Sequence, residues 1–185
     1  WLEISMWVTS LDTSVLDELP KGRGEIKTIV VPDDKRSEVV QKIIQETNKG
    51  RQAYWVCPLI EESEELNFEA AETTFKTLSS ELPTKKIGLV HGKLKPNIKT
   101  KAMVDFKNNI HEILVATTVI EVGVDVPNAT IMVIENSERL GLSQLHQLRG
   151  RIGRGEHKSL CVLIYKKPLN DIAKQRLNTV RKSVD

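Results

Sequence analysis

The chain has 185 residues, of which 39% are hydrophobic, which is enough for one well-packed domain and too few for two of comfortable size. The 27 basic and 25 acidic residues leave a net charge of +2, so the overall balance does not demand a polyanionic partner. No apolar run approaches the roughly 18 residues of a membrane span, and the first residues lack the basic and apolar regions of a secretion signal. The sequence therefore favours one globular domain and gives no sign of a membrane partner.

Cysteine usage and charge distribution say more than the totals. Cys57 and Cys161 lie far apart in apolar runs, without the spacing of a metal site or disulfide framework. We therefore expect two buried, reduced thiols, as in a cytoplasmic protein. Charge is segregated along the chain. Residues 85–101 contain six lysines and no acid, whereas residues 61–72 contain six glutamates.

Apolar runs and helical patterns alternate along the chain. Strands are predicted at 26–31, 53–60, 86–91, 112–117, 130–135 and 159–165, and helices at 35–50, 66–83, 96–109, 141–151 and 168–183. Continuous runs of Val, Ile and Leu are typical of strands that are covered on both faces. The sequence predicts an α/β fold with a mainly parallel sheet flanked by helices. Functional loops are expected at the carboxyl ends of the strands, where we place three unusual loops.

The first of these loops is "HGKLKP", residues 91–96. Lys93 and Lys95 stand beside Gly92, immediately before a helix that begins with Pro96. Backbone N–H groups and lysines there could converge on an anion. A solvated lysine-rich turn is the alternative.

The second loop is "TTVIEVGVDVPNA", residues 117–129. Thr117 and Thr118 offer hydroxyls at a strand end, and Gly123 lets the backbone approach a ligand closely. With Asp125 these residues could bind phosphate and ribose. Gly123 could equally serve a tight turn and Asp125 a helix or turn cap.

The third loop is the arginine turn, in which Arg149, Arg151 and Arg154 alternate with glycines. A guanidinium group presents a rigid fork of donors that matches phosphate oxygens in pairs, so Arg151 and Arg154 suit a triphosphate. Gln147, one helical turn earlier, could orient a water molecule or contact the phosphates. A basic surface loop is the alternative.

These loops resemble conserved motifs of superfamily 2 helicases. "QLHQLRGRIGRG" resembles motif VI, "ATTVIEVGVDVPNA" resembles motif V, and "AYWVCPLIEESE" resembles the strand and turn of motif IV, in the order of that family. "DELPKGR", "VHGKLKP" and "IENSERLGLSQLHQLRGRIGRG" are similar to the bacterial branch that remodels branched DNA. The transcription-repair coupling factors share "GLSQLHQLRGR" but differ around Val122 and Val124, and they are the alternative.

The resemblance implies a RecA-like fold of the P-loop NTPase type, with three αβα layers. It implies that residues 1–25 are a linker from a missing first lobe, residues 26–167 are the C-terminal helicase lobe, and residues 168–185 begin a truncated helical hairpin. The parent protein would be an ATP-dependent DNA helicase that acts on stalled forks and Holliday junctions in repair and recombination. Its partners would be branched DNA, the first lobe and an N-terminal wedge domain.

The resemblance also assigns roles to individual residues. Arg151 and Arg154 would be arginine fingers that reach the γ-phosphate of ATP, supported by Gln147. The nucleotide would be contacted by Gly123, Asp125 and Gly150. The DNA backbone would be contacted by His91, Gly92, Lys93, Thr117 and Thr118. Arg149 would contribute to the same turn or pair with Glu121 or Glu138.

Two elements of a complete ATPase are missing from the sequence. There is no G-x-x-x-x-G-K-[ST] loop, and no Asp-Glu pair ends an apolar strand to hold Mg²⁺. We therefore expect ATP and Mg²⁺ to be bound mainly by the first lobe and the chain alone to be inactive. A non-enzymatic nucleic-acid-binding module and a small phosphotransferase are the remaining alternatives. None of the three loops carries an aromatic residue, so contacts to DNA phosphates should dominate over contacts to bases.

Overall fold

The computed structural model describes residues 25–117 and 125–183. The strands are β1 (Ile26–Pro32), β2 (Gln52–Cys57), β3 (Ile87–Val90), β4 (Ile113–Thr117), β5 (Ala129–Ile134) and β6 (Ser159–Tyr165). The helices are α2 (Arg36–Asn48), α3 (Glu64–Glu81), α4 (Pro96–Lys107), α5 (Leu142–Arg149) and α6 (Asp171–Lys182). Two short 3₁₀ turns, η3 (Asp33–Lys35) and η4 (Ser137–Arg139), complete the described elements.

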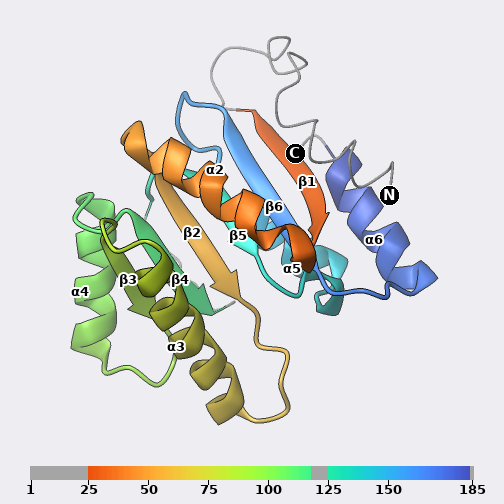
Figure 1. The fold of residues 1–185 in the computed structure, drawn as a ribbon, viewed down its shortest axis with the longest axis horizontal. Helices are drawn as coiled ribbons and strands as arrows, with labels where there is room; N and C mark the ends of the chain where they lie inside the picture. Colours follow the sequence, from red (N-terminus) through yellow and green to blue (C-terminus); the bar gives the residue numbers. More distant parts are fainter. Residues whose placement is uncertain (1–24, 118–124, 184–185) are drawn as a thin grey trace.

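The strands form one six-stranded parallel sheet with the order β1-β6-β5-β2-β4-β3 (Figure 1). Every residue of β2, β4 and β5 is buried, because these strands lie inside the sheet and are covered on both faces. This burial explains why the three strands are almost continuously apolar in sequence.

Helices cover both faces of the sheet, so the predicted three-layer αβα architecture is confirmed. On one face, Ile43 of α2 and Leu78 of α3 belong to a cluster with Trp55 of β2. On the other face, Phe106 of α4, Leu145 of α5 and Leu177 of α6 belong to a second cluster that includes Tyr54 and Met132. The alternation of Tyr54 and Trp55 in β2 thus supplies one large side chain to each layer.

The predicted elements are confirmed with small shifts at their ends. β2 stops at Cys57 because Pro58, the next residue, has no N–H to donate to a ladder. After α2 the chain turns at Gly50, which has a φ of +88° and therefore favours glycine. In the described part of the chain, none of the helices has both the length and the apolar character needed to cross a membrane.

The expected position of the arginine turn was wrong in one respect. The turn follows α5 and leads into the amino end of β6, whereas the loop after β3 lies at the carboxyl end of that strand. The reason is that α5 runs back against the direction of the parallel strands, so its last residue returns to their starting edge (Figure 1). The candidate functional residues therefore form two groups, at opposite ends of the sheet.

Candidate nucleotide and nucleic-acid sites

The arginine turn begins where α5 ends. Gly153 has a φ of +77°, a conformation that favours glycine and lets the chain reverse between the two arginines. The Arg154 Nε donates to the carbonyl of Gly150 at 3.3 Å, which leaves the terminal nitrogens of its exposed guanidinium group directed away from this contact. Arg151 is half-buried and has no polar side-chain partner among the described residues. Both guanidinium groups are therefore available to a ligand.

The structure brings Asp125 to the same place. Burial raises the pKa of Tyr54 to about 12, with the positive charge of Arg151 opposing this shift, Asp125 adding to it and Arg154 opposing it. All three charged groups thus lie near the Tyr54 phenol, although they come from two separate loops. At Gly155 an added Cβ would lie 2.9 Å from the carbonyl oxygen of Pro127, so these loops touch. Asp125, Arg151 and Arg154 form one candidate nucleotide site.

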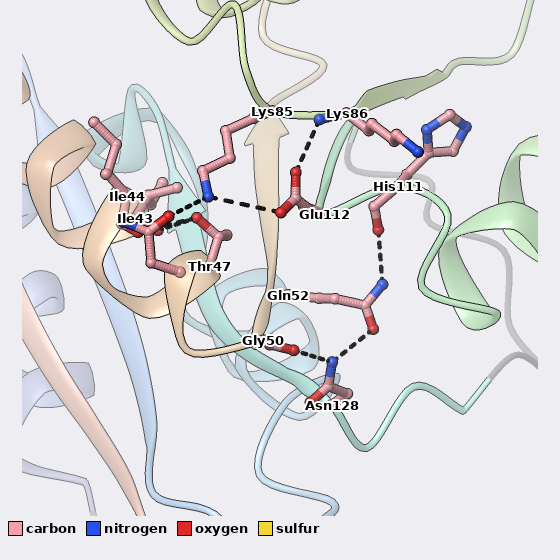
Figure 2. Close-up of polar contacts among 11 residues, drawn as sticks. Ile43, Ile44, Thr47, Gly50, Gln52, Lys85, Lys86, His111, Glu112 and Asn128 are labelled. Carbon is pink, nitrogen blue, oxygen red and sulfur yellow. Dashed lines mark hydrogen bonds and ion pairs between the residues drawn. The ribbon is translucent and has the colours of Figure 1, made fainter.

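A hydrogen-bond network centred on the buried Gln52 side chain anchors the loop that carries Asp125 (Figure 2). Gln52, at the start of β2, donates from Nε2 to the carbonyls of Phe106 and His111. Its Oε1 accepts from Asn128 Nδ2, which also donates to the carbonyl of Gly50 at 2.8 Å. The segment that leads from Asp125 into β5 is therefore tied to β2, α4 and the turn before β4.

The remaining residues that were expected to contact the nucleotide are Gln147, Gly150 and Gly123. Gln147 is exposed on α5, one turn before Arg151, and Gly150 is exposed at the end of that helix. Gly123 and Thr118 lie outside the described residues.

Arg149 differs from its two neighbours because it is almost completely buried, with 1% of its surface exposed. Its guanidinium group donates to the carbonyls of Val180 and Ser183 at 2.8 and 3.1 Å and to the Ser183 hydroxyl at 2.8 Å. It also lies 3.3 Å from the Thr28 hydroxyl. Among the described contacts of Glu138, a carboxylate oxygen accepts from the backbone N–H of Lys166. These contacts make Arg149 a link between α5, β1 and the end of α6.

Three of the residues expected to contact DNA line one pocket. The pocket has a volume of about 150 Å³ and lies at the carboxyl ends of β3 and β4. It is lined by Leu59, Glu64, Phe68, Val90, His91, Gly92, Lys99 and Thr117. The carboxyl ends of β3 and β4 are adjacent because the two strands pair in parallel, with Val90 opposite Ala116.

His91 is held firmly at the wall of this pocket. Its Nδ1 accepts from the backbone N–H of Lys93 at 3.2 Å, so Nε2 carries the proton and faces Glu72 at 3.0 Å. The ring stacks on Phe68, with 4.9 Å between ring centroids and 17° between planes. The exposed Lys93 ammonium lies 2.6 Å from Glu65, whose carboxylate raises the pKa of Lys93.

Sequence reasoning missed Phe68, Tyr54 and Gln52. The apolar spacing of the sequence places Phe68 on the buried stripe of a helix. In the structure it lies near the start of α3 and packs on His91 and Gly92. Tyr54 and Gln52 belong to a strand, where the sequence gives no sign of which face approaches a loop. Across residues 25–117 and 125–183, no cluster of three or more His, Cys, Asp or Glu side chains could hold a metal ion.

Comparisons with known proteins identify the family to which this fold belongs. Residues 34–156 match the family described as Helicase conserved C-terminal domain, and the chain belongs to this family. It is 57% identical over 176 residues to the ATP-dependent DNA helicase RecG of Haemophilus influenzae, an alignment that covers 95% of this chain and 25% of RecG. The predicted resemblance to RecG is thereby confirmed.

Solved structures give the same result. A structure of RecG bound to a three-way DNA junction matches with a TM-score of 0.75 and 43% identity, over 91% of this chain and 22% of that one. Dbp5 of S. cerevisiae matches with a TM-score of 0.63 but only 11% identity, over 100% of this chain and 48% of Dbp5, so it supports the fold alone. The chain spans about a quarter of the length of the curated relatives that it matches.

Proposed function

We propose that this chain is the second motor lobe of an ATP-dependent DNA helicase that remodels branched DNA during repair and recombination. The observation that carries the proposal is the contact between the two loops that resemble motifs V and VI, where Gly155 meets the carbonyl of Pro127. The charges of Asp125, Arg151 and Arg154 all act on Tyr54, which agrees with this contact. The similarity to RecG, including the RecG solved with a three-way junction, supports branched DNA as the substrate.

In this proposal the nucleotide is ATP, which supplies the phosphoryl group that is transferred to water. The residues present fit part of such a ligand. Arg151 and Arg154 would bind its phosphate oxygens, Asp125 would accept a hydrogen bond from a ribose hydroxyl, and Gln147 would contact a phosphate or the attacking water. The described residues offer no Mg²⁺ ligand cluster, so the metal and the remaining phosphate contacts would come from a first lobe.

The DNA contacts would lie at the opposite end of the sheet. His91, Gly92 and Thr117 are already gathered at one pocket, and Lys93 stands at its rim. A strand bound there would be held mainly through its phosphates, and its affinity would fall as salt rises.

The remaining parts of the proposal concern the rest of the protein. Residues 1–25 would be a linker from the first lobe, and α6 would open a helical hairpin that follows motif VI. The first lobe and an N-terminal wedge domain would be the partners within the same protein. We place this protein in the bacterial cytoplasm, because Cys57 and Cys161 are both buried free thiols.

The proposal is tested by Arg154→Ala in a full-length helicase that carries this lobe. DNA-stimulated ATP hydrolysis should fall by about 10³-fold or more, because an inserted arginine stabilises the charge of the transition state. Nucleotide binding should be retained, since other groups hold the ground state. Hydrolysis would be measured with forked and linear DNA at one salt concentration.

Arg51→Ala provides a matched control. Arg51 is a half-buried arginine that lines a different hollow, together with Lys86 and Asn109, and takes no part in the described contacts of the arginine turn. Its replacement should leave ATP turnover unchanged. Equal ATP turnover in the wild type and Arg154→Ala would contradict the proposal and would indicate that the arginine turn is a basic surface loop.

A further inference from the structure

The pocket beside His91 has a composition that the proposed phosphate contacts do not explain. Leu59, Phe68 and Val90 supply apolar surface, and Phe68 covers the His91 ring while also lining the cavity. A phosphate gains nothing from contact with apolar side chains, whereas the flat face of a nucleobase packs favourably against them.

Thr117 supplies a polar group to the same pocket. The residue is 1% exposed and lines the cavity, and none of the described hydrogen bonds uses its hydroxyl. The hydroxyl is therefore free to bond to a group that enters the cavity. A hydroxyl can both donate and accept, so it suits any base edge.

The charges that line the pocket also disfavour a phosphate inside it. Among the described residues that line the pocket, Glu64 carries a carboxylate and Lys99 an ammonium, and the His91 Nδ1 accepts a hydrogen bond. Lys93 lies at the rim, where its exposed ammonium is 2.6 Å from Glu65. A neutral group with N–H donors and ring acceptors matches this pair of opposite charges better than an anion does.

The volume limits the size of the occupant. About 150 Å³ is well below the roughly 300 to 1,000 Å³ of pockets that hold drug-sized ligands, so the cavity suits one ring system and not a whole nucleotide. The sugar and phosphate would remain outside, next to Lys93.

We propose that this pocket takes one unstacked nucleobase of the bound DNA strand, packed against Phe68 and hydrogen-bonded to Thr117 and Glu64. The inference rests on the proposed function, because it assumes that a strand passes this edge of the sheet. It deepens that function by adding base capture to contacts that the sequence alone assigned to the backbone. The pocket would recognise the flat shape of a base and not the identity of the base, so this contact imposes little sequence preference.

The test compares binding of the chain to a short single-stranded oligonucleotide and to an abasic oligonucleotide of the same length. Binding would be followed by fluorescence anisotropy at one low salt concentration. In the wild type the abasic strand should bind roughly tenfold more weakly, the loss expected for a stacked base. In Phe68→Leu and Thr117→Val this ratio should fall toward one, because each change removes a contact with the base but keeps most of the side-chain volume.

Lys93→Ala separates this inference from the proposed function. It should weaken both oligonucleotides by the same factor, because Lys93 would contact a phosphate that both strands carry. Circular dichroism and thermal unfolding would verify that each variant is folded. Thr117→Val serves if Phe68→Leu unfolds.

Each outcome supports or overturns one of the two proposals. An equal affinity of the wild type for the two strands, with Lys93→Ala weaker on both, would overturn the base pocket and keep the DNA role. An unchanged ratio in both folded pocket variants would overturn it as well. If the wild type binds neither strand, both the base pocket and the proposed DNA contacts of this chain are contradicted.

Discussion

At the scale of single residues, three neighbouring arginines have two different tasks. Arg151 and Arg154 are available at the surface, whereas Arg149 is buried and bonded to the carbonyls that end α6. The sequence could not distinguish them, because all three stand beside glycines in one turn. The difference arises from the residues that contact Arg149, namely Thr28, Val180 and Ser183. The sequence alone does not place them beside Arg149, because they are distant from it along the chain.

We expect Arg149→Ala to lower the free energy of unfolding by about 2 to 4 kcal/mol, because it leaves buried carbonyl groups without donors and opens a cavity. Urea unfolding followed by circular dichroism would measure the loss. Arg154→Ala is the control and should lie within about 0.5 kcal/mol of the wild type, since the residue is exposed. A similar stability of both variants would contradict the structural role of Arg149.

At the scale of elements, the sequence predicted the strands and helices well. β6 was predicted at its observed bounds, and the apolar spacing of Val39, Val40 and Ile43 correctly indicated the face of α2 that is buried. The sites were predicted only in part. His91 and Thr117 could be brought together, because adjacent parallel strands end at one edge. Asp125 lies close to the arginine turn because α5 ends at that edge of the sheet. The hydrophobic periodicity of the sequence does not predict at which edge a helix ends.

The two cysteines test the buried strands β2 and β6. Burial, and next the Glu135 carboxylate, raises the pKa of Cys57 to about 12, and burial raises the pKa of Cys161 to about 12. At a pH of about 8, only on the order of one thiol in ten thousand is then ionised, so Ellman's reagent should react very slowly with the folded chain. Two thiols should react promptly in denaturant. One fast thiol in the folded protein would contradict the burial of that strand.

The same shifts give a dependence of stability on pH. A thiol whose folded pKa is raised contributes stability that is fully present below its ordinary value of 9.0. This contribution is lost as the pH rises through about 12.

At the scale of the whole molecule, the sheet separates two kinds of contact. The group around Tyr54 lies at the starting edge of the strands, and the pocket beside His91 lies at their carboxyl edge. The overall α/β class followed from the alternation of patterns in the sequence. The separation did not, because the sequence led us to expect all three loops at one edge.

The chain alone should hydrolyse ATP no faster than the buffer does, because its sequence contains no phosphate-binding G-x-x-x-x-G-K-[ST] loop. A coupled assay with and without single-stranded DNA would measure this. Turnover above background that disappears in Arg151→Ala would show that the lobe is an ATPase by itself.

The buried Arg149 couples the arginine turn to α6 mechanically. One residue, Gly150, separates it from Arg151, and its guanidinium group donates to the Val180 and Ser183 carbonyls at the end of α6. A displacement of the carboxyl end of α5 would strain these hydrogen bonds, so we expect it to be transmitted to α6. Under the proposed function, a ligand held by Arg151 and Arg154 would therefore also affect the position of α6.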